Sequence, residues 1–102
     1  MDLGMVGLGR MGANLTRRLL RDGHRVVVHD VDGAAVDALV SEGSDGAASL
    51  EELASKLHGP RAVWVMVPAA LTGGVIDELA THLSEGDIII DGGNSFYQDD
   101  LR

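Results

Sequence analysis

The chain of 102 residues contains no cysteine and only three aromatic residues. The lack of cysteine excludes disulfides, thiolate metal sites and a thiol nucleophile, and it fits a reducing compartment. No apolar run approaches the ~20 residues that a membrane-spanning helix needs. The first residues also lack the basic segment of a signal peptide. We therefore expect a cytoplasmic protein without a membrane segment, whose core consists of aliphatic side chains.

Basic residues are scarce too, with 8 Lys and Arg against 16 Asp and Glu, so the formal net charge is −8. A surface of that sign repels the phosphate backbone of nucleic acids, and we expect no nucleic-acid partner. A small anionic ligand stays compatible with this charge, because backbone dipoles at a helix start can hold it locally. The acidic residues are spread along the chain, as on an ordinary solvated surface.

The hydrophobic residues, 45% of the chain, form an alternating pattern. Apolar runs typical of buried strands cover residues 3–8, 26–29, 62–67 and 88–90, and a further short strand is expected near Ala47. Stretches of helical spacing lie between them, the first marked by Met11, Leu15 and Leu19. Asp32, Ser49 (with Glu52 three residues on) and Thr72 are the expected helix caps. This alternation predicts an α/β fold, a Rossmann-type doubly wound parallel sheet with helices on both faces.

One glycine-rich segment carries chemistry. Residues 7–12 read Gly7, Leu8, Gly9, Arg10, Met11 and Gly12, which fits the G-x-G-x-x-G pattern between a strand and a helix. The first glycine permits a tight turn, the second lets a pyrophosphate approach the backbone, and the third allows close helix packing. The unpaired N–H groups of the first helical turn would face the phosphates. The pattern in this context predicts a dinucleotide-binding loop.

Asp30, at the end of the second expected strand, bears on which cofactor binds. Its carboxylate can accept hydrogen bonds from both hydroxyls of the adenosine ribose, whereas it would repel a 2′-phosphate by about 4 kcal/mol at ~4 Å. Val31 and Asp32 follow, so no arginine there offsets the repulsion. Arg10 is an alternative contact for a 2′-phosphate, although a solvated arginine is the simpler interpretation. The pattern favours NAD over NADP.

Four segments together resemble a known family. They are Gly-Leu-Gly-Arg-Met-Gly-Ala-Asn at 7–14, Gly-His at 23–24, Met-Val-Pro at 66–68 and Ile-Ile-Asp-Gly-Gly-Asn-Ser at 89–95. The chain resembles the N-terminal domain of decarboxylating 6-phosphogluconate dehydrogenases over residues 3–102. The Asp-Gly-Gly-Asn-Ser segment distinguishes it from 3-hydroxyisobutyrate-type relatives, and Asp30 resembles the NAD-preferring branch.

The resemblance implies specific roles for residues at the ends of the strands. The cofactor would contact the glycine loop, Asp30, Val31, Asp32, Val67, Pro68, Ala69 and Asn94, and the substrate would contact Asn94 and Ser95. The implied reaction is the oxidative decarboxylation of 6-phospho-D-gluconate to ribulose 5-phosphate, in the pentose phosphate pathway, by a homo-oligomer.

The family's catalytic Lys and Glu lie beyond this chain. Residues 1–102 are thus expected to form one dinucleotide-binding domain, truncated before a helical substrate domain and inactive alone. No catalytic residue and no metal site are assigned, since the four histidines lack metal-ligand spacing. Two alternatives remain open: a 3-hydroxyacid dehydrogenase or reductase of the same superfamily, and a non-catalytic NAD-sensing module.

Overall fold

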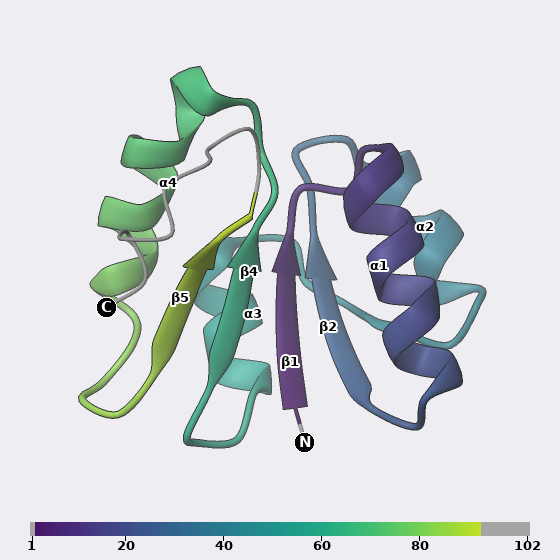
Figure 1. Ribbon diagram of the computed structural model, residues 1–102, viewed down its shortest axis with the longest axis horizontal. Coiled ribbons are helices and arrows are strands. Elements are labelled where there is room, and N and C mark those ends of the chain that lie inside the picture. Colours follow the sequence, from purple (N-terminus) through teal and green to yellow (C-terminus); the bar gives the residue numbers. More distant parts are fainter. Residues whose placement is uncertain (1, 93–102) are drawn as a thin grey trace.

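The centre of the molecule is a parallel five-stranded sheet, seen in a computed structural model that describes residues 2–92. The strands are β1 (Asp2–Val6), β2 (Arg25–His29), β3 (Asp45–Gly46), β4 (Ala62–Val65) and β5 (Ile88–Asp91). Their spatial order is β3-β2-β1-β4-β5, and every neighbouring pair is parallel. The four longer strands can be followed in this order in Figure 1. The predicted sheet is confirmed, including the short strand near Ala47.

Helices cover both faces of this sheet, as predicted. They are α1 (Arg10–Arg21), α2 (Gly33–Val40), α3 (Leu50–Lys56) and α4 (Ala69–Ala80). Two separate apolar clusters show which helix packs where. Leu39 of α2 joins Val26 and Val28 of β2 and is packed by leucines of α1, whereas Leu53 of α3 and Leu79 of α4 join the opposite cluster. The core is therefore two aliphatic layers, one on each side of the strands.

Two of the predicted helix caps are present. Asp32 accepts the Ala34 N–H at 3.0 Å and begins α2, and Ser49 accepts the Glu52 N–H at 3.0 Å and begins α3. The Glu52 carboxylate returns to the N–H of Ala48 at 2.6 Å, one residue before the cap itself. These bonds satisfy donors that have no partner inside the helix.

Three expectations were wrong in detail. The helix expected to begin at Thr72 begins at Ala69, with Pro68 at its N-cap, and the Thr72 hydroxyl donates to the Pro68 carbonyl at 3.2 Å instead of capping. Met11, expected on the buried side of its helix, is 65% exposed. The strand expected over 62–67 ends at Val65, although the Met66 N–H still donates to the Val6 carbonyl at 2.7 Å.

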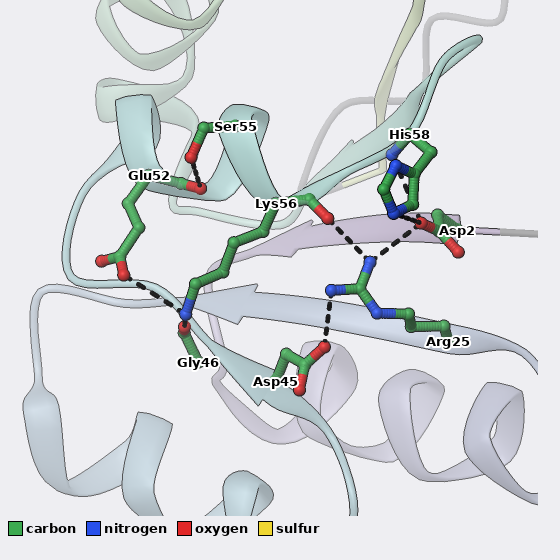
Figure 2. Close-up of polar contacts among 8 residues, drawn as sticks. All are labelled: Asp2, Arg25, Asp45, Gly46, Glu52, Ser55, Lys56 and His58. Carbon is green, nitrogen blue, oxygen red and sulfur yellow. Dashed lines mark hydrogen bonds and ion pairs between the residues drawn. The ribbon is translucent and has the colours of Figure 1, made fainter.

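The amino ends of the strands are tied together by a polar network (Figure 2). Arg25 pairs with Asp2 at 2.8 Å and with Asp45 at 2.7 Å, and it also donates to the carbonyl of Lys56 at 2.7 Å. The Lys56 ammonium in turn donates to the Gly46 carbonyl at 2.6 Å. This network fastens the end of α3 to three strands, at the edge of the sheet away from the glycine loop.

Among residues 2–92, no helix is both long enough and apolar enough to cross a membrane. The described part of the chain also holds no group of three His, Cys, Asp or Glu side chains placed to bind a metal ion.

Candidate dinucleotide-binding site

The carboxyl ends of β1, β2 and β4 lie at the same end of the sheet, and the strand order reverses between the neighbouring strands β1 and β4 (Figure 1). Open α/β sheets bind ligands at such a switch point. A cleft of about 900 Å³ lies there, within the range of small-molecule sites. Its walls come from five segments: Val6, Gly7, Leu8, Gly9, Arg10, Met11 and Gly12; His29, Asp30 and Val31; Ala48, Ser49 and Leu50; Met66, Val67 and Pro68; and Leu71, Val75 and Glu78.

The three glycines of the loop each meet a different geometric requirement. Gly7 adopts φ +97°, a left-handed conformation that favours glycine, and a Cβ there would lie 2.7 Å from the Met66 carbonyl. A Cβ on Gly12 would overlap the Gly7 carbonyl oxygen. A Cβ on Gly9 would meet nothing within 4 Å, although Gly9 lines the cleft. The turn and packing roles predicted for Gly7 and Gly12 are met, and the space at Gly9 is open toward the cleft.

Helix α1 begins directly after Gly9, which is its N-cap and has no side chain to accept a hydrogen bond. The first N–H groups of a helix lack acceptors within it. Those of Arg10, Met11 and Gly12 belong to residues that line the cleft. The helix dipole adds a partial positive charge at the same place. This end of the cleft can therefore bind a phosphate group through the backbone, in a chain whose net charge is negative.

Asp30 follows β2 and forms part of the same wall. Its carboxylate accepts the Leu8 N–H at 2.6 Å through Oδ2 and the Asp32 N–H at 2.9 Å through Oδ1. Each carboxylate oxygen can accept a further bond. The carboxylate thus joins the loop after β1 to the loop after β2 and keeps acceptor capacity for a ligand.

Most of the predicted site residues come together here. All six loop residues, and Asp30, Val31, Val67 and Pro68, line the cleft. Asp32 and Ala69 lie next to lining residues but are not part of the wall themselves. Asn94 and Ser95 fall outside the described residues. Lys56, whose ammonium binds the Gly46 carbonyl, lies outside the cleft wall.

Two wall segments were missed by sequence reasoning. One is the loop after β3, from Ala48 to Leu50, and the other is the face of α4 formed by Leu71, Val75 and Glu78. The α4 residues follow the spacing i, i+4, i+7, which places them on one side of a helix. That spacing was visible in the sequence, but the helix start assigned to Thr72 placed Leu71 outside the helix.

The strand order and the glycine loop at the switch point define a nucleotide-binding α/β domain. The family described as the NAD binding domain of 6-phosphogluconate dehydrogenase matches residues 2–102. The chain belongs to this family, and it is an NAD(P)-binding domain with a Rossmann-like fold.

Individual relatives carry the same family name. The chain is 39% identical over 103 residues to an NAD(+)-dependent, decarboxylating 6-phosphogluconate dehydrogenase of Haloferax volcanii, a match that takes in 100% of this chain and 34% of that protein. It is 45% identical over 107 residues to a decarboxylating 6-phosphogluconate dehydrogenase of Haemophilus ducreyi, covering 99% of this chain and 22% of the relative. The chain therefore spans about a third or less of these relatives.

Solved structures agree with the sequence relatives. The 6-phosphogluconate dehydrogenase of Plasmodium falciparum, described in apo form and in complexes with NADP+ and 6-phosphogluconate, superposes with a TM-score of 0.85 at 28% identity. The superposition takes in 97% of this chain and 23% of that one. An NAD+ complex of prephenate dehydrogenase from A. aeolicus, at 23% identity and a TM-score of 0.79, shares the fold.

Proposed function

We propose that the cleft binds NAD in preference to NADP. The observation that carries this proposal is the Asp30 carboxylate in the cleft wall, beside the glycine loop. Each oxygen that accepts one backbone N–H keeps capacity for a ribose hydroxyl. A 2′-phosphate at ~4 Å from that carboxylate would cost about 4 kcal/mol at a near-surface dielectric. The NADP+ complex is a property of the Plasmodium falciparum relative, which is 28% identical to this chain.

The residues that follow Asp30 offer no compensating cation. Val31 is 99% exposed, and Asp32 already accepts the Ala34 N–H as a helix cap. Arg10, the first residue of α1, is exposed and is the one Lys or Arg side chain among the described residues of the cleft wall. An exposed arginine gains little from a single contact because water competes for it. The charges around the ribose position therefore favour a ligand without a 2′-phosphate.

The fit of a pyrophosphate rests on Gly9 and on the start of α1. The open space beside Gly9 lets a phosphate reach the backbone, and the N–H groups of the first turn can bind it. Val67 and Pro68 line the cleft at the end of β4 and would contact the cofactor there. Asp32 and Ala69 would flank it, while Asn94 would contact both cofactor and substrate and Ser95 the substrate.

We further propose that the protein to which this domain belongs oxidises and decarboxylates 6-phospho-D-gluconate to ribulose 5-phosphate. NAD, when bound, supplies the hydride acceptor. The residues of this chain bind the cofactor and orient it at the sheet edge, while the acid and base of the reaction lie on other parts of the protein. A cytoplasmic location and a homo-oligomeric full-length protein belong to the same proposal.

A chimera tests this activity. This chain replaces the matching N-terminal residues of the Haloferax volcanii relative, to which it is 39% identical. We expect NADH formation that depends on 6-phosphogluconate, and an Asn94→Ala chimera should raise KM for that substrate. A folded chimera that binds NAD but forms no NADH with 6-phosphogluconate would show that the domain serves another reaction or a sensing role.

A further inference from the structure

Asp30 makes a contact that a ribose-binding role does not require. Its Oδ2 accepts the Leu8 N–H at 2.6 Å, a short bond to a charged acceptor from a residue 22 positions earlier. Hydrogen bonds to an ionised carboxylate are about twice as strong as neutral ones. The carboxylate is therefore part of the construction of the glycine loop.

The bond fixes one particular peptide unit. Leu8 N–H and Gly7 C=O belong to the same planar group. Asp30 accepts the Leu8 N–H of this peptide group. The Gly7 carbonyl oxygen of the same group lies so close to Gly12 that a Cβ on Gly12 would overlap it. Backbone bonds anchor the flanking residues, since the Gly7 N–H donates to the His29 carbonyl at 2.9 Å and the Ala13 N–H to the Gly9 carbonyl at 2.8 Å. Rotation of the Gly7–Leu8 peptide would break the Asp30 bond and displace the loop from α1.

We propose that Asp30 is a positioning residue for the phosphate loop as well as a ribose contact. By accepting the Leu8 N–H, it holds the segment between β1 and α1 so that the first N–H groups of α1 face a pyrophosphate. This inference rests on the proposed dinucleotide function. It has a distinct consequence: replacing Asp30 lowers the affinity for both NAD and NADP through the loop, in addition to relieving the repulsion of a 2′-phosphate.

Asparagine is an informative replacement because it keeps the size of the side chain. Its amide has one acceptor oxygen, and its NH₂ group would face the second backbone N–H. In Asp30→Asn the bond to Leu8 is therefore lost when the NH₂ group faces Leu8, and it is weakened when the neutral amide oxygen replaces the carboxylate there. The matched control is Asp37→Asn, the same change of charge at an exposed position of α2.

The binding experiment uses NAD and an NAD analogue that lacks both hydroxyls of the adenosine ribose. Calorimetry measures both ligands with the parent chain, Asp30→Asn and Asp37→Asn. We expect Asp30→Asn to lower the affinity for the analogue by about tenfold and Asp37→Asn to leave that affinity unchanged. If Asp30→Asn bound the analogue as tightly as the parent, Asp30 would act through the ribose alone and the positioning role would be refuted.

A second measurement needs no ligand. In the unmodified chain, NMR should detect a scalar coupling through the hydrogen bond between the Leu8 amide nitrogen and the Asp30 carboxyl carbon. The Leu8 amide should also exchange with solvent about tenfold faster in Asp30→Asn than in Asp37→Asn. Absence of the coupling, or equal exchange in the two variants, would refute the positioning role. A parent chain that shows the coupling but binds no dinucleotide would refute the proposed function and leave the loop contact established.

Discussion

At the scale of single residues, Gly9 is the loop position where a pyrophosphate would approach the backbone most closely. It has φ −66° and ψ −169°, which any residue can adopt, and a Cβ would meet no atom within 4 Å. Gly9→Ala should therefore lower the free energy of unfolding by no more than about 1 kcal/mol, the preference of an N-cap position for glycine over alanine. The added methyl group would occupy the space of the pyrophosphate, so the affinity for NAD should fall by about tenfold or more. Urea unfolding and calorimetry measure the two effects separately.

Gly12→Ala is the counterpart of that variant, because its Cβ would overlap the Gly7 carbonyl oxygen. Relieving such an overlap must move the helix or the loop. We expect the free energy of unfolding to fall by about 1–3 kcal/mol and the affinity for NAD to fall as well.

A folded Gly9→Ala chain that binds NAD as tightly as the parent would mean that no pyrophosphate lies against the loop.

The structural roles of the loop glycines could be predicted from the sequence, but not all contacts of the loop could. The pattern identified the turn at Gly7 and the close approach at Gly12, since each follows from a missing Cβ. It did not reveal that Asp30 accepts the Leu8 N–H. The direction of a backbone N–H depends on how two distant loops are juxtaposed, and no spacing of residue types encodes that.

At the scale of elements, β4 and β5 are joined at their amino ends by Arg61 and Asp87. The Asp87 side chain is 4% exposed, and its carboxylate accepts bonds from the Arg61 side chain at 2.8 Å and from the N–H groups of Arg61 and Ser84, both at 2.7 Å. Removing one member of a buried pair leaves an uncompensated charge. Asp87→Ala should lower the free energy of unfolding by about 3 kcal/mol or more, measured by urea denaturation.

Glu42→Ala is the control for this effect. Its pair with Arg17 is equally short, at 2.8 Å, but both side chains are 41% exposed, so its loss should cost less than about 1 kcal/mol. Equal losses in the two variants would contradict the structural role given to Asp87.

The same carboxylate should make the domain sensitive to acid. Burial raises the pKa of Asp87, but hydrogen bonds from Ser84 and Arg61 outweigh burial, and the pKa lies below its ordinary value of 3.8. A lowered folded-state pKa stabilises the fold above the ordinary value, and this stabilisation is lost as the pH falls through the lowered one. The urea concentration at the unfolding midpoint should therefore decrease as the pH is lowered below about 4. The decrease should be smaller in Asp87→Asn. A parent chain and an Asp87→Asn variant with parallel pH profiles would rule this out.

The strands and most helix starts followed from the sequence, whereas α4 did not. Asp32 and Ser49 cap their helices as predicted because a side-chain acceptor at that position is a local signal. Helix α4 instead begins after Pro68, where Ala69 and Ala70 favour helix without a side-chain cap. Met11 is exposed because it lies in the first turn of α1, where it lines the open cleft, whereas Leu15 and Leu19 further along the helix pack against the core. The position of the cleft is a tertiary feature, and helical periodicity does not contain it.

At the scale of the whole molecule, we expect the chain to bind the cofactor without catalysing the reaction by itself. It spans 34% of the Haloferax volcanii relative and 22% of the Haemophilus ducreyi relative. General acid–base groups contribute about 10²–10⁴ in rate, and none is assigned to the cleft wall. The purified chain should therefore form no NADH from NAD and 6-phosphogluconate. Turnover above a no-enzyme control, measured by NADH absorbance, would place the catalytic groups within these residues.

The most direct test of the account is calorimetric titration of the unmodified chain with NAD and with NADP, at one ionic strength. Both ligands share the pyrophosphate that the loop would bind, and they differ only at the 2′-position beside Asp30. We predict that both titrations follow a single-site isotherm and that NAD binds more tightly by about tenfold or more. Equal affinities would remove Asp30 from its proposed role in cofactor choice, and the absence of binding by either dinucleotide would contradict the account as a whole.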